Sequence, residues 1–149
     1  MNEIRPWLFI GNYNDTQNKN ALDFNSIRAM LQLAAPVKQI GIASLYLQVN
    51  DMSPVKHELI KQGVEFALAE KKIGNKILVS CAAGVNRSSG FCIAILKESE
   101  GLSLLDAFKE VKKSRPQVMP HELVWTSLCS YYREDTPYLD LMRASAEYY

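Results

Sequence analysis

The chain has 149 residues, of which 48% are hydrophobic and 22% charged, and it carries 17 lysines and arginines against 16 aspartates and glutamates. A chain of this length is expected to fold as one domain, residues 1–149, whose core needs no disulfide or metal for stability. The formal net charge of +1 argues against a protein that binds nucleic acid through bulk charge.

The sequence lacks the features of a disulfide-rich, metal-binding, secreted or membrane protein. Cys81, Cys92 and Cys129 are odd in number and include no C-x-x-C pair. Cys92 and Cys129 lie in apolar helical patterns and are expected to be buried, with a redox pairing of Cys92 and Cys81 as the alternative. His57 and His121 are far apart, so we expect no metal and no cofactor. Without a signal peptide or a run of roughly 20 apolar residues, a soluble, cytoplasmic monomer is expected.

The first third of the chain predicts strands. Residues 7–11 are a short apolar run that ends at a glycine. Residues 21–35 fit a helix or a strand, and within them residues 27–34 have the character of a strand that ends before Pro36. Residues 45–50 alternate between apolar and polar side chains, which is the pattern of a half-buried strand.

A long helix and a buried strand are predicted next. Ser53 is a suitable N-cap and Pro54 a suitable first helical residue; apolar side chains then recur at helical spacing, and Gly74 ends the helix. Residues 76–80 are apolar without alternation, as in a parallel strand covered on both faces. Residues 88–101 follow as a helix that is apolar nearly all round and therefore central.

Two more helices complete the predicted fold. Residues 103–116 begin with Ser103 and Asp106 in capping-box positions, and residues 120–134 are amphipathic. The tail, residues 135–149, is expected to hold a short helix at most. Strands that alternate with crossover helices predict an α/β fold, a single compact domain with a mainly parallel central sheet flanked by helices.

The segment CAAGVNR, residues 81–87, joins the strand at 76–80 to the next helix, and ligands of α/β folds bind at this edge of the sheet. The N-terminus of that helix presents unpaired N–H groups and a partial positive charge, which suit an anion. The first residues after the cysteine are small, so successive N–H groups can close around an oxyanion. The residues expected to bind a phosphate are Ala82, Ala83, Gly84, Val85, Asn86 and Arg87.

Three side chains of this region suit phosphoryl transfer. Cys81 lies at the base of the predicted loop, where the local field favours the thiolate nucleophile over the thiol. Arg87 can grip two phosphate oxygens with its planar guanidinium. Ser88 can hydrogen-bond the sulfur and help the thiolate leave, although a helix cap would also explain a serine at this position.

A leaving alkoxide or phenoxide also needs a general acid. Asp51 follows the strand predicted at 45–50, so in a parallel sheet it is expected at the same edge as Cys81. Its carboxyl group can protonate the leaving oxygen and can later deprotonate the attacking water. An ordinary turn residue is the alternative interpretation of Asp51.

Four stretches of the chain resemble the dual-specificity phosphatase family of the cysteine-dependent protein tyrosine phosphatase superfamily. The C-x5-R-S signature is present as CAAGVNRS, and NDMSP is similar to the acid loop. WLFIGNYNDTQN resembles the opening strand and turn, and SRPQVMPHELVWTSLCSYY the arginine–proline segment and last helix, so the resemblance spans residues 5–132. It implies a protein tyrosine phosphatase-like fold and a metal-independent hydrolase. Its substrates would be phosphorylated proteins or peptides, at phosphotyrosine and also at phosphoserine and phosphothreonine, with a phosphocysteine intermediate.

Two positions depart from the family's pattern. Ser80 stands where the family has a histidine before the cysteine, and because serine lacks the reach of an imidazole, we expect weaker support of the thiolate and slower turnover. His121 stands where the family often has asparagine, which affects the packing of that loop. Ser80 also leaves open a pseudophosphatase, a binding module that holds phosphopeptides without hydrolysing them.

The same residues bear on the substrate. No lysine and no further arginine lies between Cys81 and Arg87, which disfavours phosphoinositides. Asn86 before Arg87 resembles the RNA 5′-triphosphatases of the superfamily, but those enzymes usually lack the acid, so Asp51 favours phosphomonoesters. The short chain, with no extra segment before the first strand, predicts a shallow pocket that admits phosphoserine and phosphothreonine as well as phosphotyrosine. Sulfur transfer or arsenate reduction would use the same cysteine–arginine spacing but would not need Asp51.

Overall fold

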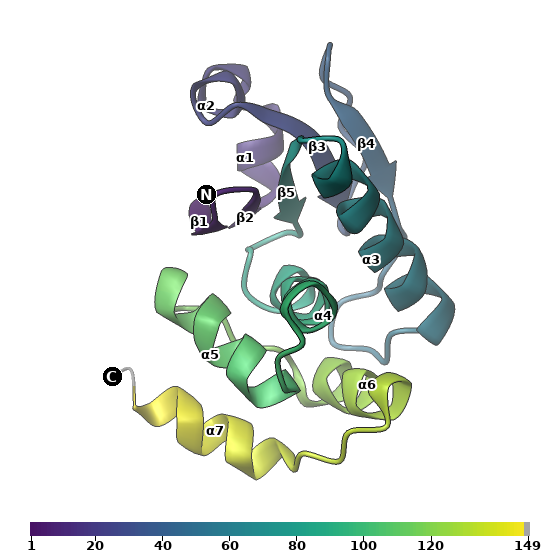
Figure 1. The fold of residues 1–149 in the computed structure, drawn as a ribbon, viewed down its shortest axis with the longest axis vertical. Helices are drawn as coiled ribbons and strands as arrows, with labels where there is room; N and C mark the ends of the chain where they lie inside the picture. The colour runs from purple at the N-terminus through teal and green to yellow at the C-terminus, as the bar shows by residue number, and fades with distance from the viewer. Residues whose placement is uncertain (148–149) are drawn as a thin grey trace.

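The computed structural model describes residues 1–147 and has a five-stranded sheet with helices on both faces (Figure 1). Its strands are β1 (Asn2–Arg5), β2 (Leu8–Gly11), β3 (Ile27–Gln32), β4 (Ala43–Tyr46) and β5 (Lys76–Ser80). They are arranged in the order β1-β2-β5-β3-β4; β1 and β2 are antiparallel and the other neighbours are parallel. The prediction of an α/β fold with a mainly parallel sheet is confirmed.

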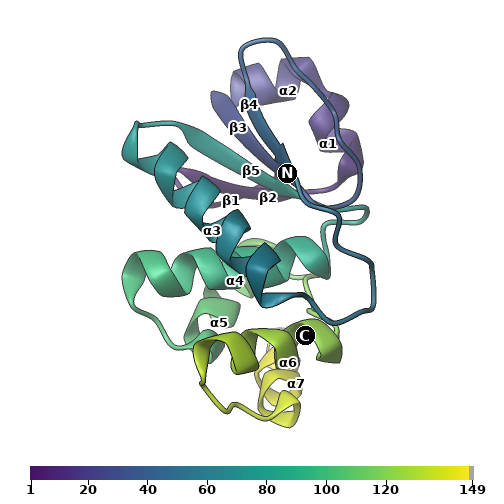
Figure 2. The same ribbon diagram turned by 90° about the vertical axis from the view of Figure 1, so that its right-hand side faces the viewer.

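The helices are divided between the two faces of the sheet. Within the described residues they are α1 (Tyr13–Gln17), α2 (Lys19–Phe24), α3 (His57–Lys72), α4 (Arg87–Glu100), α5 (Leu104–Ser114), α6 (Glu122–Tyr132) and α7 (Tyr138–Ala146). Figure 2 shows α1 and α2 on one face and α3 to α7 on the other, with α4 between the sheet and α6. No helix in residues 1–147 is both long enough and apolar enough to cross a membrane.

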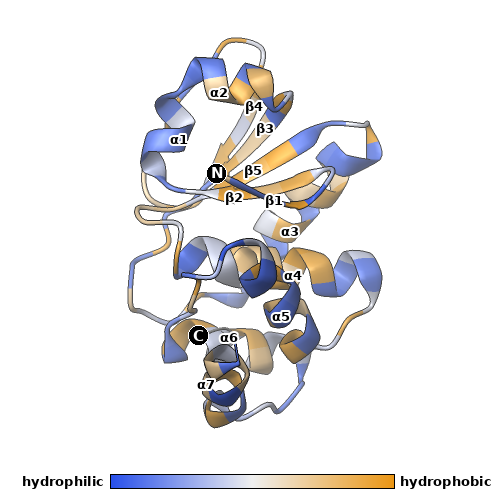
Figure 3. Cartoon of the chain, turned by 90° about the vertical axis from the view of Figure 1, so that its left-hand side faces the viewer, coloured by the Kyte–Doolittle hydropathy of each residue, from blue (hydrophilic) through white to orange (hydrophobic). Residues whose placement is uncertain are grey.

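The position of β5 in the centre of the sheet explains why its sequence is apolar without alternation. It lies between β2 and β3, and its side chains pack on both faces of the sheet. Ile77 and Val79 belong to the large core on the side of α3 to α7, whereas Leu78 belongs to the smaller core that includes Leu22 of α2. In Figure 3 the inner strands of the sheet are coloured mostly as hydrophobic, whereas the helices carry both hydrophobic and hydrophilic residues. The strand therefore ends at Ser80 as a rigid, buried base for the loop that follows.

The helix α4 is central, as its sequence predicts. Residues 87–96 are all buried, because α3, α5 and α6 surround the helix on the sides that the sheet leaves free. Gly101 ends the helix in the left-handed conformation, with φ of 69°. Because β5 and α4 are both held in the core, the short loop between them is fixed at both ends.

The strand predicted at 45–50 is wrong in its bounds. The strand is β4, Ala43–Tyr46; the N–H of Leu47 still donates to the carbonyl oxygen of Gln32 in β3 at 2.9 Å, and the chain then leaves the sheet. Leu47 and Val49 are nevertheless only 5% and 4% exposed. Their alternation with polar residues therefore records burial against the core, which continues beyond the end of the strand.

The predicted start of the long helix is also wrong. The helix α3 begins at His57 with Lys56 at its N-cap, so Pro54 is not its first residue and Ser53 is not its cap. The Oγ of Ser53 instead donates to the carbonyl oxygen of Asp51 at 3.2 Å. The serine side chain therefore stabilises a turn, which is a common alternative to capping a helix.

The two ends of the chain contain elements that the sequence only partly predicts. The strand β1 and the helix α1 are absent from the prediction. The ambiguous stretch 21–35 contains the end of α2 and all of β3, and Ser26 lies between them with φ of 57°. The short helix expected in the tail is α7, and residues 148–149 of that tail lie outside the described residues.

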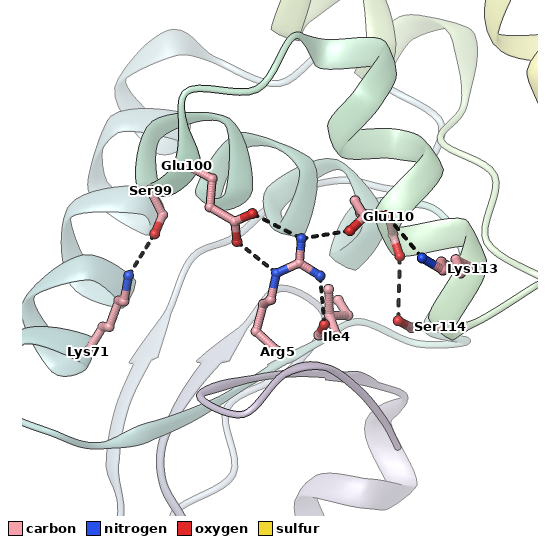
Figure 4. Close-up of polar contacts among 8 residues, drawn as sticks. All are labelled: Ile4, Arg5, Lys71, Ser99, Glu100, Glu110, Lys113 and Ser114. Carbon is pink, nitrogen blue, oxygen red and sulfur yellow. Dashed lines mark hydrogen bonds and ion pairs between the residues drawn. The ribbon is translucent and has the colours of Figure 1, made fainter.

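Arg5 of β1 attaches the N-terminal hairpin to two helices (Figure 4). Its Nε and Nη2 donate to the carboxylate of Glu100 at 2.8 and 2.9 Å, and Nη2 also donates to Glu110 at 2.8 Å. These hydrogen bonds from Arg5 lower the pKa of Glu100 below its usual value. Nearby, Lys71 Nζ donates to Ser99 Oγ at 2.8 Å. The cluster holds the hairpin edge of the sheet against α4 and α5.

Candidate active site

The loop of residues 81–86 turns its carbonyl groups outward. Five consecutive carbonyl oxygens accept hydrogen bonds from partners outside the loop: Ala82 from Tyr13 N (3.2 Å), Ala83 and Gly84 from Arg115 (3.2 and 2.8 Å), Val85 from Met119 N (3.0 Å), and Asn86 from Ser89 Oγ (2.6 Å). The described residues contain no cis peptide bond, and in a trans peptide each N–H points opposite to the preceding carbonyl. The N–H groups of residues 83–87 therefore point to the inner side of the loop, where they form a nest for an anion.

Cys81 is the first residue after β5 and lies at the base of this nest. Its side chain is 2% exposed, and its Sγ lies 3.2 Å from the Oγ of Ser88, which is fully buried in the first turn of α4. The predicted nucleophile and the predicted sulfur partner are thus in hydrogen-bond contact. Ser80, the residue that replaces the family's histidine, is also buried.

Arg87 is held by the backbone of two other segments. Its Nη1 donates to the carbonyl oxygens of Leu33 at 3.1 Å and Val49 at 2.8 Å, and the residue is 8% exposed. Its Nε is buried and has no hydrogen-bond partner in the described structure. A buried guanidinium donor without a partner is costly, and an oxyanion in the nest would satisfy it.

Asp51 reaches the site from the loop between β4 and α3. Its side chain is 54% exposed, and its Oδ1 accepts a 2.7 Å hydrogen bond from Nδ2 of Asn86. The same oxygen lies 3.6 Å from Nε of Arg87. The expected position beside the loop is correct, although Asp51 stands five residues beyond the end of β4 rather than at the end of a strand.

These groups surround one cavity of about 370 Å³. The residues that line it are Asp51, Met52, Cys81, Ala82, Ala83, Val85, Asn86, Arg87, Met119, Pro120, His121 and Tyr138. Of the predicted site residues, Gly84 and Ser88 do not line the cavity, because both are packed behind it. Among residues 1–147, no group of three or more histidine, cysteine or acidic side chains is arranged to hold a metal ion.

A family model described as the dual specificity phosphatase catalytic domain matches residues 8–134. The chain belongs to the dual specificity phosphatase family. It is 30% identical to dual specificity protein phosphatase 2 of Mus musculus over 124 residues, which are 80% of this chain and 39% of that protein. It is 30% identical to dual specificity protein phosphatase 18 of Homo sapiens over 140 residues, which are 88% of this chain and 72% of that protein.

The fold agrees with this family membership. The crystal structure of human DUSP28 superposes with a TM-score of 0.83 at 25% identity, and the match covers 89% of this chain and 96% of that chain. The protein tyrosine phosphatase-like fold that the resemblance implies is therefore confirmed. The chain spans about two fifths of the length of the mouse phosphatase 2 that it matches.

Several residues that line this cavity are not among the site residues predicted from the sequence. Tyr138 is the first residue of α7, outside the region that the family model matches, and its hydroxyl donates to the carbonyl oxygen of Pro120 at 2.7 Å. Burial raises the pKa of Tyr138, with a smaller contribution from Glu122. Met52 and Met119 add apolar surface. Met52 and Met119 lie inside stretches that resemble the family, but an apolar side chain there carries no signal of its own, and Tyr138 lies beyond those stretches.

The other two cysteines lie outside the cavity lining. Cys92 is fully buried in α4, and burial raises the pKa of its thiol well above the usual value, with the Cys81 charge adding to the effect. Burial also raises the pKa of Cys129, whose Sγ contacts the carbonyl oxygen of Thr136. Both thiols are therefore kept protonated, which favours a packing role for them over thiolate chemistry.

Proposed function

We propose that the chain is a metal-independent protein phosphatase that hydrolyses phosphomonoesters through a phosphocysteine intermediate. Its substrates would be phosphotyrosine and also phosphoserine and phosphothreonine in proteins. The observation that supports this most is the loop of residues 81–86, whose outward carbonyl groups leave five N–H groups directed inward above Cys81. Such a nest stabilises the charge that develops on the equatorial oxygens of a transferring phosphoryl group.

In the first step, the thiolate of Cys81 attacks phosphorus while the bond from phosphorus to the leaving oxygen breaks. Arg87 and the inward N–H groups bind the nonbridging oxygens, and the unpartnered Nε of Arg87 would gain an acceptor. Asp51 gives its proton to the leaving oxygen, which departs as an alcohol or phenol. The products are the free hydroxyl and the phosphocysteine.

In the second step, Asp51 takes a proton from water as the water oxygen attacks phosphorus and the sulfur–phosphorus bond breaks. The electron pair returns to Cys81 Sγ as thiolate. Ser88 Oγ, 3.2 Å from that sulfur, can donate a hydrogen bond to the departing thiolate. Inorganic phosphate leaves, and Asp51 is protonated again for the next cycle.

The cavity lining supports a single phosphate group as the recognised anion. Arg87 and His121 are the basic side chains among its lining residues, while methionine, proline and tyrosine make up much of the wall. A triphosphate or a multiply phosphorylated lipid headgroup would need more cationic partners. The apolar walls suit the side chain of a phosphorylated residue.

Hydrolysis of p-nitrophenyl phosphate with excess chelator tests this function. We expect turnover by the wild-type protein and none by Cys81→Ser, while Cys129→Ser, a change at a half-buried cysteine outside the cavity, keeps full activity. Asp51→Asn should slow hydrolysis of a phosphotyrosine peptide about 10²- to 10⁴-fold. Binding of phosphopeptide without turnover would favour a pseudophosphatase instead, and release of phosphate only from 5′-triphosphate RNA would favour a triphosphatase.

A further inference from the structure

The side chain of Asn86 makes two hydrogen bonds, which together allow only one orientation of its amide group. Its Oδ1 accepts from the backbone N–H of His121 at 2.6 Å, and its Nδ2 donates to Oδ1 of Asp51 at 2.7 Å. A backbone N–H is always a donor, so the atom of Asn86 that faces His121 must be the oxygen. The amino group must then face Asp51, where it meets an acceptor.

The loop that carries Asp51 is anchored on both sides of this residue but exposed between the anchors. Before it, the carbonyl oxygen of Val49 accepts from Arg87 Nη1 at 2.8 Å. After it, the N–H of Val55 donates to the Oγ of Ser127 at 2.9 Å. Asn50, Asp51 and Met52 are exposed. A short, exposed segment of this kind has conformational freedom that a contact to the rigid loop of residues 81–86 would restrict.

The contacts of the Asp51 carboxylate within the described residues all converge on one oxygen. Its Oδ1 accepts from Asn86 Nδ2 at 2.7 Å and from the N–H of Met52 at 3.1 Å, and it lies 3.6 Å from Arg87 Nε. All three partners carry hydrogens, so they favour Oδ1 as the acceptor oxygen. The other oxygen, Oδ2, is then left to carry the proton that is transferred.

We propose that Asn86 is a positioning residue that fixes the carboxyl group of Asp51 over the phosphate nest, with Oδ1 held and Oδ2 free for proton transfer. This inference rests on the proposed function, in which Asp51 is the general acid. Asn86 is part of the loop that would bind the phosphate, and its side chain also hydrogen-bonds the acid, Asp51. It therefore sets the distance between the two groups that must act on opposite ends of the breaking bond, and errors of about 1 Å in such a distance cost up to 10²-fold in rate.

A role for Asn86 in packing alone is the competing explanation, because its Oδ1 also holds the segment at His121. The two roles separate in Asn86→Asp. Aspartate has the same shape and keeps an acceptor for the His121 N–H, but it presents an oxygen instead of a donor to Asp51. Asn50→Asp is the matched control, since it adds the same charge to the exposed loop at the neighbouring position.

The test is the dependence of kcat/KM on the leaving group, measured with aryl phosphates whose phenols range from weakly to strongly basic. A poor leaving group needs the acid, whereas a good one does not. We expect Asn86→Asp to lower kcat/KM for the poorest leaving group about 10- to 100-fold more than for the best. Asn50→Asp should leave that ratio unchanged. Any general effect of the new charge on phosphate binding is the same for every substrate and cancels in the ratio.

The double variant Asp51→Asn/Asn86→Asp completes the test. If Asn86 acts through Asp51, adding Asn86→Asp to Asp51→Asn produces no further change in the ratio. An equal loss of activity for all leaving groups, or multiplied effects in the double variant, would overturn the inference while leaving the phosphatase function intact. Wild-type activity no higher than that of Cys81→Ser would instead reject the proposed function itself.

Discussion

Arg115 donates a 2.8 Å hydrogen bond from Nε to the carbonyl oxygen of Gly84, behind the loop that forms the anion nest. The same guanidinium donates to Ala83 at 3.2 Å and to Oδ1 of Asn2 at 2.6 Å, and the residue is 7% exposed. One buried cation thus joins the end of α5, the hairpin and the middle of the loop. By binding two carbonyl groups from outside, Arg115 directs the N–H groups that follow them to the inside.

Replacing Arg115 with methionine is expected to disorganise this nest. Methionine keeps much of the packing volume but leaves the carbonyl groups of Ala83 and Gly84 without their donors. We expect inhibition by vanadate, a phosphate analogue, to weaken by at least about 10-fold, and the free energy of unfolding to fall by about 2–4 kcal/mol. Steady-state inhibition and urea denaturation measure the two effects.

The control for this prediction is Arg143→Met, which changes an exposed arginine of α7. It should alter neither vanadate inhibition nor the urea midpoint. Unchanged vanadate inhibition in a folded Arg115→Met protein would mean that the loop keeps its conformation without the buried guanidinium.

Gly84 is the position of the loop that tolerates a side chain least. Its φ is +70°, and a Cβ built on it would lie 2.7 Å from the carbonyl oxygen of Gly11 and 2.8 Å from Nη2 of Arg115. We expect Gly84→Ala to lower kcat/KM more than about 10²-fold and to destabilise the fold by about 2–4 kcal/mol. Aryl phosphate kinetics and thermal unfolding measure these effects.

Gly41→Ala separates backbone strain from the clash. Gly41 has a similar φ of +79°, but no atom lies within 4 Å of its built Cβ. It should cost about 1–2 kcal/mol of stability and leave kcat/KM unchanged. Equal losses of activity in the two variants would show that the close approach to Gly11 and Arg115 does not matter.

The predictable parts of this fold are those whose signal is local. Residues 76–80 are predicted correctly because burial on both faces requires a continuous apolar run, and the loop after them carries its own spacing motif. Ser103 is predicted as a cap because its Oγ accepts from the N–H of Asp106, three residues away. Such features depend on neighbours in the sequence, so one sequence is enough to find them.

The missed parts depend on residues that are far apart in the sequence. Of the four residues of β1, only Ile4 is buried, and the segment is a strand because it pairs with β2. Asn86 and His121 are 35 residues apart, and Arg115 and Asn2 are 113 apart. No local pattern signals these contacts, although they position the predicted catalytic groups.

Tyr138 is expected to contribute to substrate binding rather than to chemistry. Its ring lines the cavity while its hydroxyl is occupied by the carbonyl oxygen of Pro120. Tyr138→Ala removes that wall, so we expect KM for a phosphotyrosine peptide to rise about 3- to 10-fold with little change in kcat. Tyr138→Phe keeps the ring and should have a smaller effect.

Inhibition by inorganic phosphate provides the internal check on this prediction. Phosphate fills the nest but not the apolar walls, so its inhibition constant should be the same in Tyr138→Ala and wild type. Leu139→Ala, a change at the exposed neighbouring side chain, serves as the control. A parallel loss of phosphate inhibition would indicate that α7 supports the loop itself rather than the substrate side chain.

Glu134 connects the end of α6 to the start of α5 and should contribute stability that depends on pH. Its carboxylate accepts from Lys97 Nζ and from the N–H of Leu104, both at 2.6 Å. Burial acts to raise the pKa of Glu134, but the hydrogen bonds from Lys97 and Leu104 outweigh it, and the pKa is lowered. Near neutral pH, Glu134→Gln should therefore reduce the free energy of unfolding by about 1–2 kcal/mol.

The lowered pKa determines how this difference varies with pH. The unfolded chain has an ordinary glutamate pKa of about 4.3, so the contribution of Glu134 is fully present above that pH. It is lost as the pH falls through the lower pKa of the folded state, where wild type and Glu134→Gln should converge. Urea denaturation at a series of pH values measures this, with Glu65→Gln at an exposed ion pair as a control within about 0.5 kcal/mol of wild type. A difference that stays constant down to the acid limit would mean that the charge on Glu134 does not contribute, and that the shape of its side chain alone stabilises the start of α5.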